Sequence, residues 1–250
     1  MKLRGENLAA SYDGRGIFED VSFEVEQGTF LSVLGPSGCG KSTLLNVLSG
    51  ILTADRGQVY LDDSPVTGIS PHFSYMPQDD LLMPWLSILD NVCLYGSIHG
   101  GKKELREKAM AYMPEFGLAG YEHRYPETLS GGMRQRAAFL RTALCPAEVM
   151  LLDEPFASLD VITRGSMQDW LSAMRQTLGR TTLLVTHDID EAIYLSDSIL
   201  ILNRLSGRPA GIRKRIEIAQ KKRSREWLFA QTELRQEIYR LLMEESHEDH

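Results

Sequence analysis

Apolar residues along the chain gather in short runs that end at glycine, acidic or polar residues. Phe30–Leu34 and Val149–Leu152 are almost uninterrupted, which is typical of strands buried on both faces of a parallel sheet. Thr182–Val185 and Ser198–Leu202 repeat the same pattern further along the chain. Buried strands separated by helical patterns predict an α/β fold with a parallel sheet.

Other segments have apolar residues at helical spacing. Thr43–Leu48 predicts a helix that carries Leu44, Leu45 and Leu48 on one face. Lys103–Met113 predicts an amphipathic helix, because its apolar positions recur every three or four residues among charged ones. The segments between these patterns contain glycine and proline, which mark turns.

Three longer regions complete the predicted organisation. Residues 1–30 and 57–76 carry short alternating strands, for example Gly57–Asp62. Residues 87–144 are predicted to be mostly helical and to form an insertion into the strand-helix pattern. Glu226–Leu242 predicts one final helix with mixed charges.

Composition limits the classes of protein that fit. With 250 residues and 43% hydrophobic content, the chain is expected to form a single domain over residues 1–250. A net charge of −7 argues against a nucleic-acid partner. No apolar run approaches the roughly 18 residues of a membrane span, and the polar start Met1–Glu6 predicts no signal peptide. Cys39, Cys93 and Cys145 lack metal-ligand spacing, so a cytosolic, reduced protein is expected.

The segment Gly35–Ser42 matches the pattern G-x-x-x-x-G-K-[ST] of a phosphate-binding P-loop. It lies between a predicted strand and a predicted helix, so backbone N–H groups and the helix N-terminus can surround phosphate oxygens. In this interpretation Lys41 reaches the β- and γ-phosphates and Ser42 binds Mg²⁺; the alternative is a glycine-rich turn before an ordinary helix. The predicted nucleotide-binding residues here are Gly35, Pro36, Ser37, Gly38, Cys39, Gly40, Lys41, Ser42 and Thr43.

Asp153 and Glu154 directly follow the apolar run Val149–Leu152. They are predicted to lie at the carboxyl end of a buried strand, where open α/β sheets bind ligands. Asp153 has the position of a carboxylate that holds Mg²⁺, and Glu154 is placed to act on the attacking water. A strand that ends in a solvated acidic turn is the alternative.

Leu129–Arg136 contains the sequence Ser130-Gly131-Gly132 at the start of a predicted helix, which makes a second candidate anion cradle. An ordinary helix cap is the alternative for this segment alone. Together with the P-loop and the acidic pair, however, the segment resembles the signature sequence of ATP-binding-cassette (ABC) ATPases. The family pattern has glutamine after the two glycines, and this chain has Met133.

The resemblance implies a P-loop NTPase (RecA-like) α/β core, a small antiparallel β-subdomain formed by the strands of residues 1–30 and 57–76, and an inserted α-helical signature subdomain over residues 87–144. It implies that Tyr12 stacks on adenine and that Gln78 contacts Mg²⁺ and water. Asp160, in the segment Ser158-Leu159-Asp160, would communicate across a dimer, and His187 would contact the γ-phosphate. Without the resemblance, Tyr12 and His187 are better explained as structural residues.

The activity implied by the resemblance is ATP hydrolysis with Mg²⁺ at two composite sites in a homodimer. Ser130, Gly131 and Gly132 would come from the partner subunit. The expected partners are transmembrane permease subunits and, indirectly, a solute-binding protein, with the ATPase peripheral on the cytoplasmic face of the membrane. A soluble ABC protein without a transport role, and a stand-alone P-loop kinase or GTPase, are rival hypotheses.

The segment Gln78–Val92 contains Leu81-Leu82-Met83-Pro84-Trp85 after an acidic pair. It is similar to the nitrate/sulfonate/taurine branch of bacterial importers, with thiamine-precursor and riboflavin importers as neighbours. Trp85 is expected to line a groove for a helix of the membrane subunit; the alternative is a buried core tryptophan. A basic run from Arg208 to Arg225 is expected to be a solvated surface, with contact to anionic lipid headgroups as the alternative.

Overall fold

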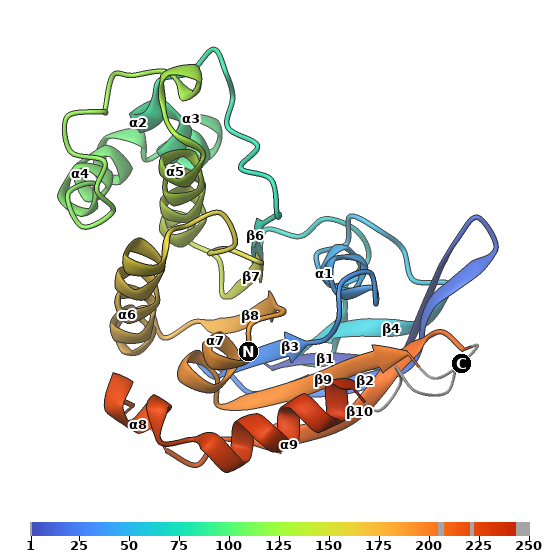
Figure 1. The fold of residues 1–250 in the computed structure, drawn as a ribbon. Helices are drawn as coiled ribbons and strands as arrows, with labels where there is room; N and C mark the ends of the chain where they lie inside the picture. Colours follow the sequence, from blue (N-terminus) through green and yellow to red (C-terminus); the bar gives the residue numbers. More distant parts are fainter. Residues whose placement is uncertain (1, 205–207, 221–222, 244–250) are drawn as a thin grey trace.

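The computed structural model describes residues 2–204, 208–220 and 223–243 (Figure 1). In the described residues, ten strands form one mixed sheet in the order β5-β4-β1-β2-β10-β9-β3-β8-β7-β6. The strands are β1 (Leu3–Tyr12), β2 (Arg15–Val25), β3 (Phe30–Leu34), β4 (Arg56–Leu61), β5 (Ser64–Pro65), β6 (Phe73–Met76), β7 (Val149–Asp153), β8 (Thr181–Thr186), β9 (Ser198–Arg204) and β10 (Ala210–Glu217).

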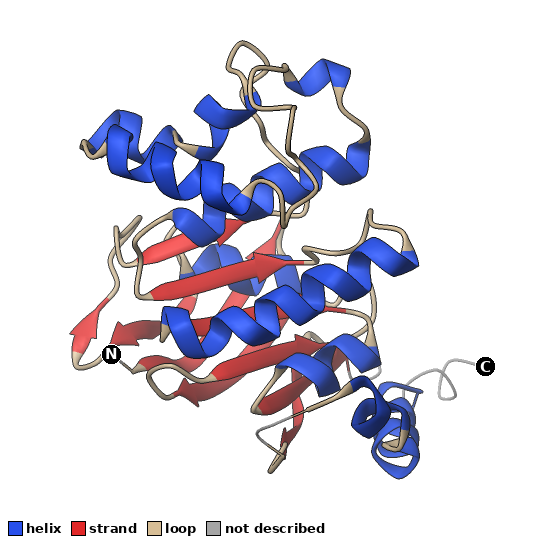
Figure 2. Cartoon of the chain, turned by 90° about the vertical axis from the view of Figure 1, so that its left-hand side faces the viewer, coloured by secondary structure: helices blue, strands red, loops and turns tan. Residues whose placement is uncertain are grey.

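Helices pack along both sides of this sheet (Figure 2). They are α1 (Lys41–Leu48), α2 (Ile88–Val92), α3 (Leu94–His99), α4 (Lys102–Tyr112), α5 (Gly131–Leu144), α6 (Val161–Leu178), α7 (Ile189–Leu195), α8 (Arg225–Phe229) and α9 (Thr232–Met243), with a short 3₁₀ turn η1 (Pro126–Thr128). Helices α2 to α5 gather at the top of Figure 1, away from the antiparallel strands. Their assignment as a separate inserted subdomain over residues 87–144 stays a prediction.

The predicted buried strands form the parallel half of the sheet. β9, β3, β8, β7 and β6 pair in parallel, and every residue of β3, β7 and β8 is buried. Leu34 pairs with Thr186 and Asp153 pairs with Val185, so three strands end at one edge. This edge therefore collects the segments that follow β3, β7 and β8.

Alternate residues of the parallel strands point to opposite faces, and each face has its own core. Leu31 and Val33 of β3 pack in a cluster that contains Leu44 and the other buried residues of α1. Phe30 and Leu34 belong to a second cluster, which extends to α5, α6 and α7. Apolar side chains on both faces explain why β3 has almost no polar residues.

Two sequence predictions about elements are wrong in part. Phe73–Met76 was expected in the antiparallel sheet, but β6 pairs in parallel with β7, where Phe73 and Met76 are buried in the clusters on opposite faces of the sheet. The single final helix expected over Glu226–Leu242 is two helices, α8 and α9. Arg235 donates to the carbonyls of Leu228 (2.6 Å) and Phe229 (3.2 Å), which satisfies the end of α8 and permits the break.

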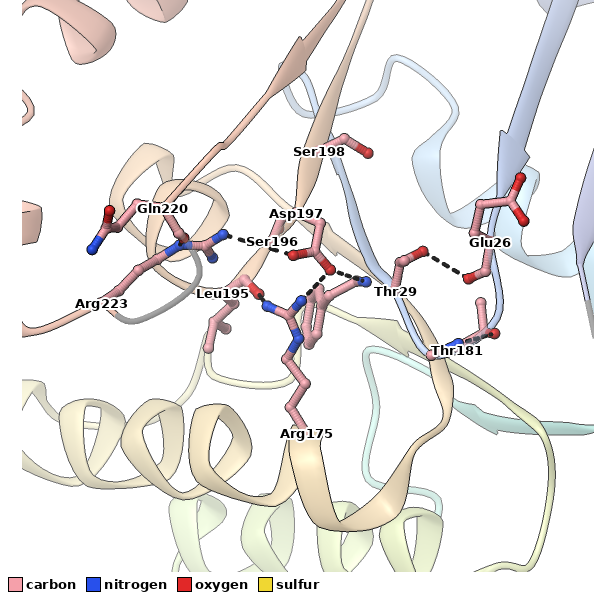
Figure 3. Close-up of polar contacts among 12 residues, drawn as sticks. Glu26, Thr29, Arg175, Thr181, Leu195, Ser196, Asp197, Ser198, Gln220 and Arg223 are labelled. Carbon is pink, nitrogen blue, oxygen red and sulfur yellow. Dashed lines mark hydrogen bonds and ion pairs between the residues drawn. The ribbon is translucent and has the colours of Figure 1, made fainter.

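At the opposite edge of the sheet, Asp197 joins the beginnings of the strands (Figure 3). Its carboxylate accepts a hydrogen bond from the Phe30 N–H (2.9 Å) and pairs with Arg175 of α6. Arg223 lies 3.9 Å away with a side chain only 2% exposed. Burial, and secondarily the charge of Arg175, lowers the pKa of Arg223 to about 10.

This arrangement bears on the basic run between Arg208 and Arg225. Lys214 pairs with Glu237 at 2.5 Å and Arg215 pairs with Glu217 at 2.6 Å, so both charges are already balanced. Arg223 is buried, which excludes it from a lipid-contacting face. Lys221 and Lys222, also part of that prediction, lie outside the described residues. The solvated-surface interpretation holds for Lys214 and Arg215. It is wrong for Arg223, as is the lipid alternative, because the Arg223 side chain is buried against Asp197.

Candidate nucleotide-binding site

The loop Gly35–Gly40 connects the end of β3 to α1, and its shape requires glycine at two positions. A Cβ on Gly35 would lie 2.1 Å from the carbonyl oxygen of Leu202 in β9. Gly40 has a φ of 101°, in the left-handed region that side chains disfavour. Cys39 is buried against Leu202, and burial raises the pKa of its thiol, so it packs the loop and does not react.

Lys41 is the first residue of α1 and is almost completely buried. Its ammonium group donates to the carbonyls of Gly35 (2.8 Å) and Pro36 (3.0 Å), inside the curve of the loop. Pro36, Ser37 and Gly38 are exposed, so the loop itself faces solvent. An exposed loop around a lysine at a helix N-terminus is suited to phosphate binding.

Asp153 ends β7 and is only 2% exposed. Burial raises the pKa of this carboxyl, and the neighbouring charge of Glu154 adds to the shift, while hydrogen bonds from Ser42 and Tyr75 oppose it. The Oδ1 atom is buried without a hydrogen-bond partner. An unsatisfied carboxylate oxygen beside a serine hydroxyl fits the oxygen ligands that Mg²⁺ prefers.

The metal site would be sparse on the protein side. Among the described residues, no three His, Cys, Asp or Glu side chains come close enough to hold a metal ion together. Ser42 and Asp153 would therefore leave most positions to water and phosphate oxygens, which is usual for Mg²⁺. Gln78 is exposed in the loop after β6, and its predicted contact with Mg²⁺ stays a prediction.

Glu154 and His187 meet because β7 and β8 are neighbours in the sheet. The His187 Nδ1 lies 3.1 Å from the Glu154 Oε2. Glu154 has a φ of 48°, and its N–H donates to the carbonyl of Val185 at 2.9 Å. Such strained backbone in a non-glycine residue is characteristic of functional sites, and here it turns the Glu154 side chain toward His187.

Two other predicted site residues are helix caps. Ser130 accepts a hydrogen bond from the Met133 N–H (3.3 Å) at the start of α5. Asp160 accepts from the N–H groups of Ile162 (3.1 Å) and Thr163 (3.0 Å) at the start of α6. Hydrogen bonds from Thr163 are the main reason that the pKa of Asp160 is lowered.

The structure does not bring all predicted residues to the P-loop. The segment Ser130-Gly131-Gly132 starts α5 in the helical region of Figure 1, away from the P-loop before α1. Tyr12 ends β1 in a hairpin and is 72% exposed. The roles implied for Ser130, Gly131, Gly132, Tyr12 and Asp160 therefore stay predictions.

Sequence reasoning missed the residues that hold the segment after Gln78. Arg134 Nε donates to Asp80 Oδ2 (2.9 Å), and Arg141 donates to the carbonyls of Asp80 (2.8 Å) and Leu81 (2.9 Å). Both arginines are on α5, so the segment is fixed to the helix that Ser130 caps. The sequence shows many arginines and acidic residues, so it gives no specific signal that Arg134 and Arg141 contact this segment.

Asn91 of α2 determines the conformation of the apolar loop that precedes this helix. It is fully buried, accepts from the Met83 N–H (2.7 Å) and donates to the carbonyls of Met83 and Leu86 (both 3.1 Å). The loop presents Trp85 at its surface with 71% of the side chain exposed. The alternative that Trp85 is a core residue is therefore wrong.

A glycine-rich loop after one buried strand, with two acids at the end of another, defines a P-loop nucleotide-binding protein. The family model described as "ABC transporter" matches residues 18–157. The chain belongs to this family and is an ATP-binding-cassette ATPase, as predicted.

The chain is 42% identical to the formylaminopyrimidine import ATP-binding protein ThiZ of Halalkalibacterium halodurans, over 98% of this chain and 97% of the relative. It is 40% identical to the taurine import ATP-binding protein TauB of Pseudomonas aeruginosa, over 87% and 83%. A dimeric bacterial ABC transporter cassette, MJ0796, superposes with a TM-score of 0.77 at 25% identity, covering 87% of this chain and 99% of that one. The predicted P-loop NTPase fold is confirmed. Within the described residues, no helix is long and apolar enough to span a bilayer.

Proposed function

We propose that the protein is the ATP-hydrolysing subunit of an ABC importer of the nitrate/sulfonate/taurine type. The observation that carries the proposal is the meeting of three strand ends, which places the P-loop, the Asp153–Glu154 pair and His187 at one edge of the sheet. Relatives at about the same identity are named as taurine and formylaminopyrimidine import proteins. Their names support import, and the loop sequence around Trp85 favours the taurine branch.

The residues divide the work of phosphoryl transfer to water. Lys41 and the N–H groups of the P-loop bind the β- and γ-phosphates of ATP, and Tyr12 stacks on its adenine. Ser42, Asp153 and Gln78 would hold Mg²⁺, which would neutralise charge on the phosphate oxygens. Glu154 accepts a proton from the attacking water.

His187 contributes to the hydrolysis step through both of its ring nitrogens. Its Nδ1 holds the Glu154 carboxylate at 3.1 Å, so the carboxylate keeps one orientation while the other ring nitrogen faces the γ-phosphate. Positioning and charge neutralisation supply most of the rate enhancement in this kind of reaction.

The assembly would be a homodimer in which each site takes residues from both subunits. Ser130, Gly131 and Gly132 of one subunit cover the nucleotide on the P-loop of the other, and Asp160 contacts the dimer partner. Ser130 and Gly131 are exposed in the single chain, as such a surface requires. The similarity to a dimeric cassette supports this arrangement.

Permease subunits in the membrane are the proposed partners of the loop around Trp85. Leu81 and Trp85 are exposed and follow Gln78 closely in the sequence, so a permease helix bound to them could act on the ATP site through the segment that carries Gln78. The protein would then act peripherally on the cytoplasmic face of the membrane, and a solute-binding protein would deliver the solute from the other side.

The test is Glu154→Gln in the purified protein. Loss of a positioned base costs about 10²–10⁴-fold in rate, so hydrolysis should fall about a hundredfold or more while ATP binding is retained. Size-exclusion chromatography with ATP and Mg²⁺ should then show an accumulated dimer. Glu148→Gln is the matched control, because Glu148 is exposed, pairs with His72 and lies before β7. A Glu154→Gln variant that hydrolyses ATP at the wild-type rate would contradict the proposed role.

A further inference from the structure

Glu191 of α7 is a buried carboxylate that the proposed mechanism does not use. Its residue is 5% exposed, and no cation lies in hydrogen-bonding contact with it among the described residues. The carboxylate accepts from the Thr186 hydroxyl at 2.7 Å and from the Gln168 amide at 3.1 Å. Two neutral donors therefore hold a group that is costly to bury in its charged form.

These hydrogen bonds lead directly to the turn that carries His187. The Thr186 hydroxyl oxygen also accepts from the N–H of Asp188 at 3.0 Å, so it bridges the two neighbours of His187. The Thr186 hydroxyl donates its one proton to Glu191, and a lone pair of the same oxygen accepts from the Asp188 N–H. Because an ionised carboxylate can only accept, the charge of Glu191 sets the direction of the hydrogen bond between Thr186 and Glu191.

The turn is also fixed from the side of α7. The Asp188 carboxylate caps this helix by accepting from the N–H groups of Asp190 (2.8 Å) and Glu191 (3.1 Å), and it lies 3.6 Å from Arg164 of α6. Arg164 is thus paired with Asp188, which leaves Glu191 dependent on Thr186 and Gln168.

In the other direction the network reaches the C-terminal helices. The Gln168 side-chain oxygen accepts from Arg225 at 2.9 Å, and Arg225 is the first residue of α8. This contact fixes the Gln168 amide so that its NH₂ group faces Glu191. A continuous hydrogen-bonded path therefore runs from α8 through α6 and α7 to the His187 turn.

We propose that Glu191 is a positioning residue for His187, whose ionised carboxylate orients Thr186 so that the turn holds His187 against Glu154. The inference rests on the proposed function of Glu154 and His187. Protonation reverses one hydrogen bond: the carboxyl O–H donates to Thr186 Oγ1, so the Thr186 hydroxyl must turn its own proton to another acceptor. This rotation moves the lone pair that accepts from the Asp188 N–H. The turn loosens, and ATP hydrolysis slows.

The protonation of Glu191 is expected to change within the physiological pH range. Burial raises the pKa of Glu191 to about 7; the Asp188 charge adds to the shift, and hydrogen bonds from Thr186 and Gln168 and the charge of Arg164 oppose it. Asp190 of α7 is paired with Arg235 of α9 and is turned away from this network. Hydrolysis should therefore rise with pH through about 7.

The experiment measures kcat and KM for ATP against pH in the purified wild type and in Glu191→Gln. The glutamine is uncharged at all pH values and donates to Thr186, so it mimics the protonated state. We expect kcat to fall about three- to tenfold at high pH, with KM for ATP nearly unchanged. The wild-type step near pH 7 should be absent.

Two further variants distinguish the network from general damage. Thr186→Val should reproduce the loss of kcat, and Thr186→Ser, which keeps the hydroxyl, should restore it. Asp190→Asn, on the same turn of α7 but paired with Arg235, should keep the wild-type pH profile.

The outcomes separate this inference from the proposed function. If Glu154→Gln abolishes hydrolysis but Glu191→Gln keeps the pH step and the wild-type kcat, the inference is overturned and the proposed function stands. A lower melting temperature with an unchanged pH profile would assign Glu191 a structural role only and also overturn it. If Glu154→Gln does not slow hydrolysis, the proposed function is contradicted, and the inference about Glu191 falls with it.

Discussion

At the scale of single residues, burial controls the acids of this protein. Asp153 and Glu191 are each at most 5% exposed, and burial raises the pKa of both carboxyls. Both accept hydrogen bonds from hydroxyl groups, and Asp153 Oδ1 has no partner. A carboxylate that is shielded from water and has no ion-pair partner among the described residues is suited to metal binding at Asp153 and to control of a turn at Glu191.

The raised pKa of Glu191 has a consequence for stability. In the unfolded chain the carboxyl loses its proton above about pH 4.5, whereas in the folded protein it keeps the proton up to about pH 7. The folded state therefore binds more protons in this window, and the free energy of unfolding falls as pH rises through it. The cost of the charged form is about 3 kcal/mol.

Glu191→Gln should remove this pH dependence. The difference in free energy of unfolding, variant minus wild type, should increase between about pH 5 and pH 8 and level off above the folded pKa. Urea denaturation at a series of pH values measures it. If the difference in free energy of unfolding stays constant between about pH 5 and pH 8, the pKa of Glu191 is the same in the folded and unfolded protein, which contradicts the prediction.

At the scale of elements, loops between strands and helices are held by residues from distant segments. Asn91 holds the loop around Met83, and Arg134 and Arg141 hold the segment at Asp80. Trp85 consequently stands at the surface on a loop with a defined conformation. A large aromatic side chain on such a loop is suited to partner contact.

Trp85→Ala should leave the isolated ATPase stable. An exposed side chain contributes within about 0.5 kcal/mol, so the melting temperature should hardly change, whereas association with the permease and transport should be lost. Trp170→Ala is the matched control, because Trp170 packs on Phe116 with ring centroids 4.7 Å apart and should cost about 3 kcal/mol. Unchanged membrane association in Trp85→Ala would contradict the hypothesis that Trp85 lines a groove for a helix of the permease.

Asp197 is an ion-pairing residue that links segments far apart in the chain. It bonds to the start of β3, pairs with Arg175 of α6 and faces buried Arg223. Asp197→Ala should destabilise the protein by about 3–5 kcal/mol, because two guanidinium groups lose their carboxylate. The exposed pair of Lys214 and Glu237 provides the control: Lys214→Ala should cost less than about 1 kcal/mol. Equal losses in urea denaturation would contradict the assignment.

At the scale of the whole molecule, the two segments proposed to bind one nucleotide lie in different parts of the chain. The P-loop lies between β3 and α1, and the Ser130 cap lies at the start of α5 in the helical region. The two segments lie apart in the single chain, so the proposed composite site would need a second copy. This geometry leads to a test with mixed dimers.

The mixed dimers carry Ser130→Arg and Lys41→Ala in two arrangements. With one change in each subunit, both lesions fall on the same site and the second site stays intact. With both changes in one subunit and a wild-type partner, each site is damaged. The first dimer should therefore occlude more nucleotide than the second. Equal occlusion in tagged and purified mixed dimers would contradict sites shared between subunits.

Much of the fold was predictable because it depends on local spacing. The runs Phe30–Leu34 and Val149–Leu152 are buried strands, and Thr43–Leu48 lies within α1 with its leucines in the core. Continuous apolar residues are explained only by burial on both faces, so neighbours in the sequence are enough to recognise such strands. The P-loop was equally recognisable, since its residues match a contiguous pattern and Gly40 is required by the left-handed backbone of the loop itself.

The remaining features depend on residues far apart in the chain. β6 joined the parallel strands because β7, more than 70 residues later, supplied its hydrogen bonds. Thr186 and Glu191 are close in sequence, but Gln168 and Arg225 reach them only when α6 and α8 pack on α7. Sequence patterns therefore determined the strands, the P-loop and the family, while tertiary packing decided which acids are buried, where Trp85 is exposed and how the His187 turn is held.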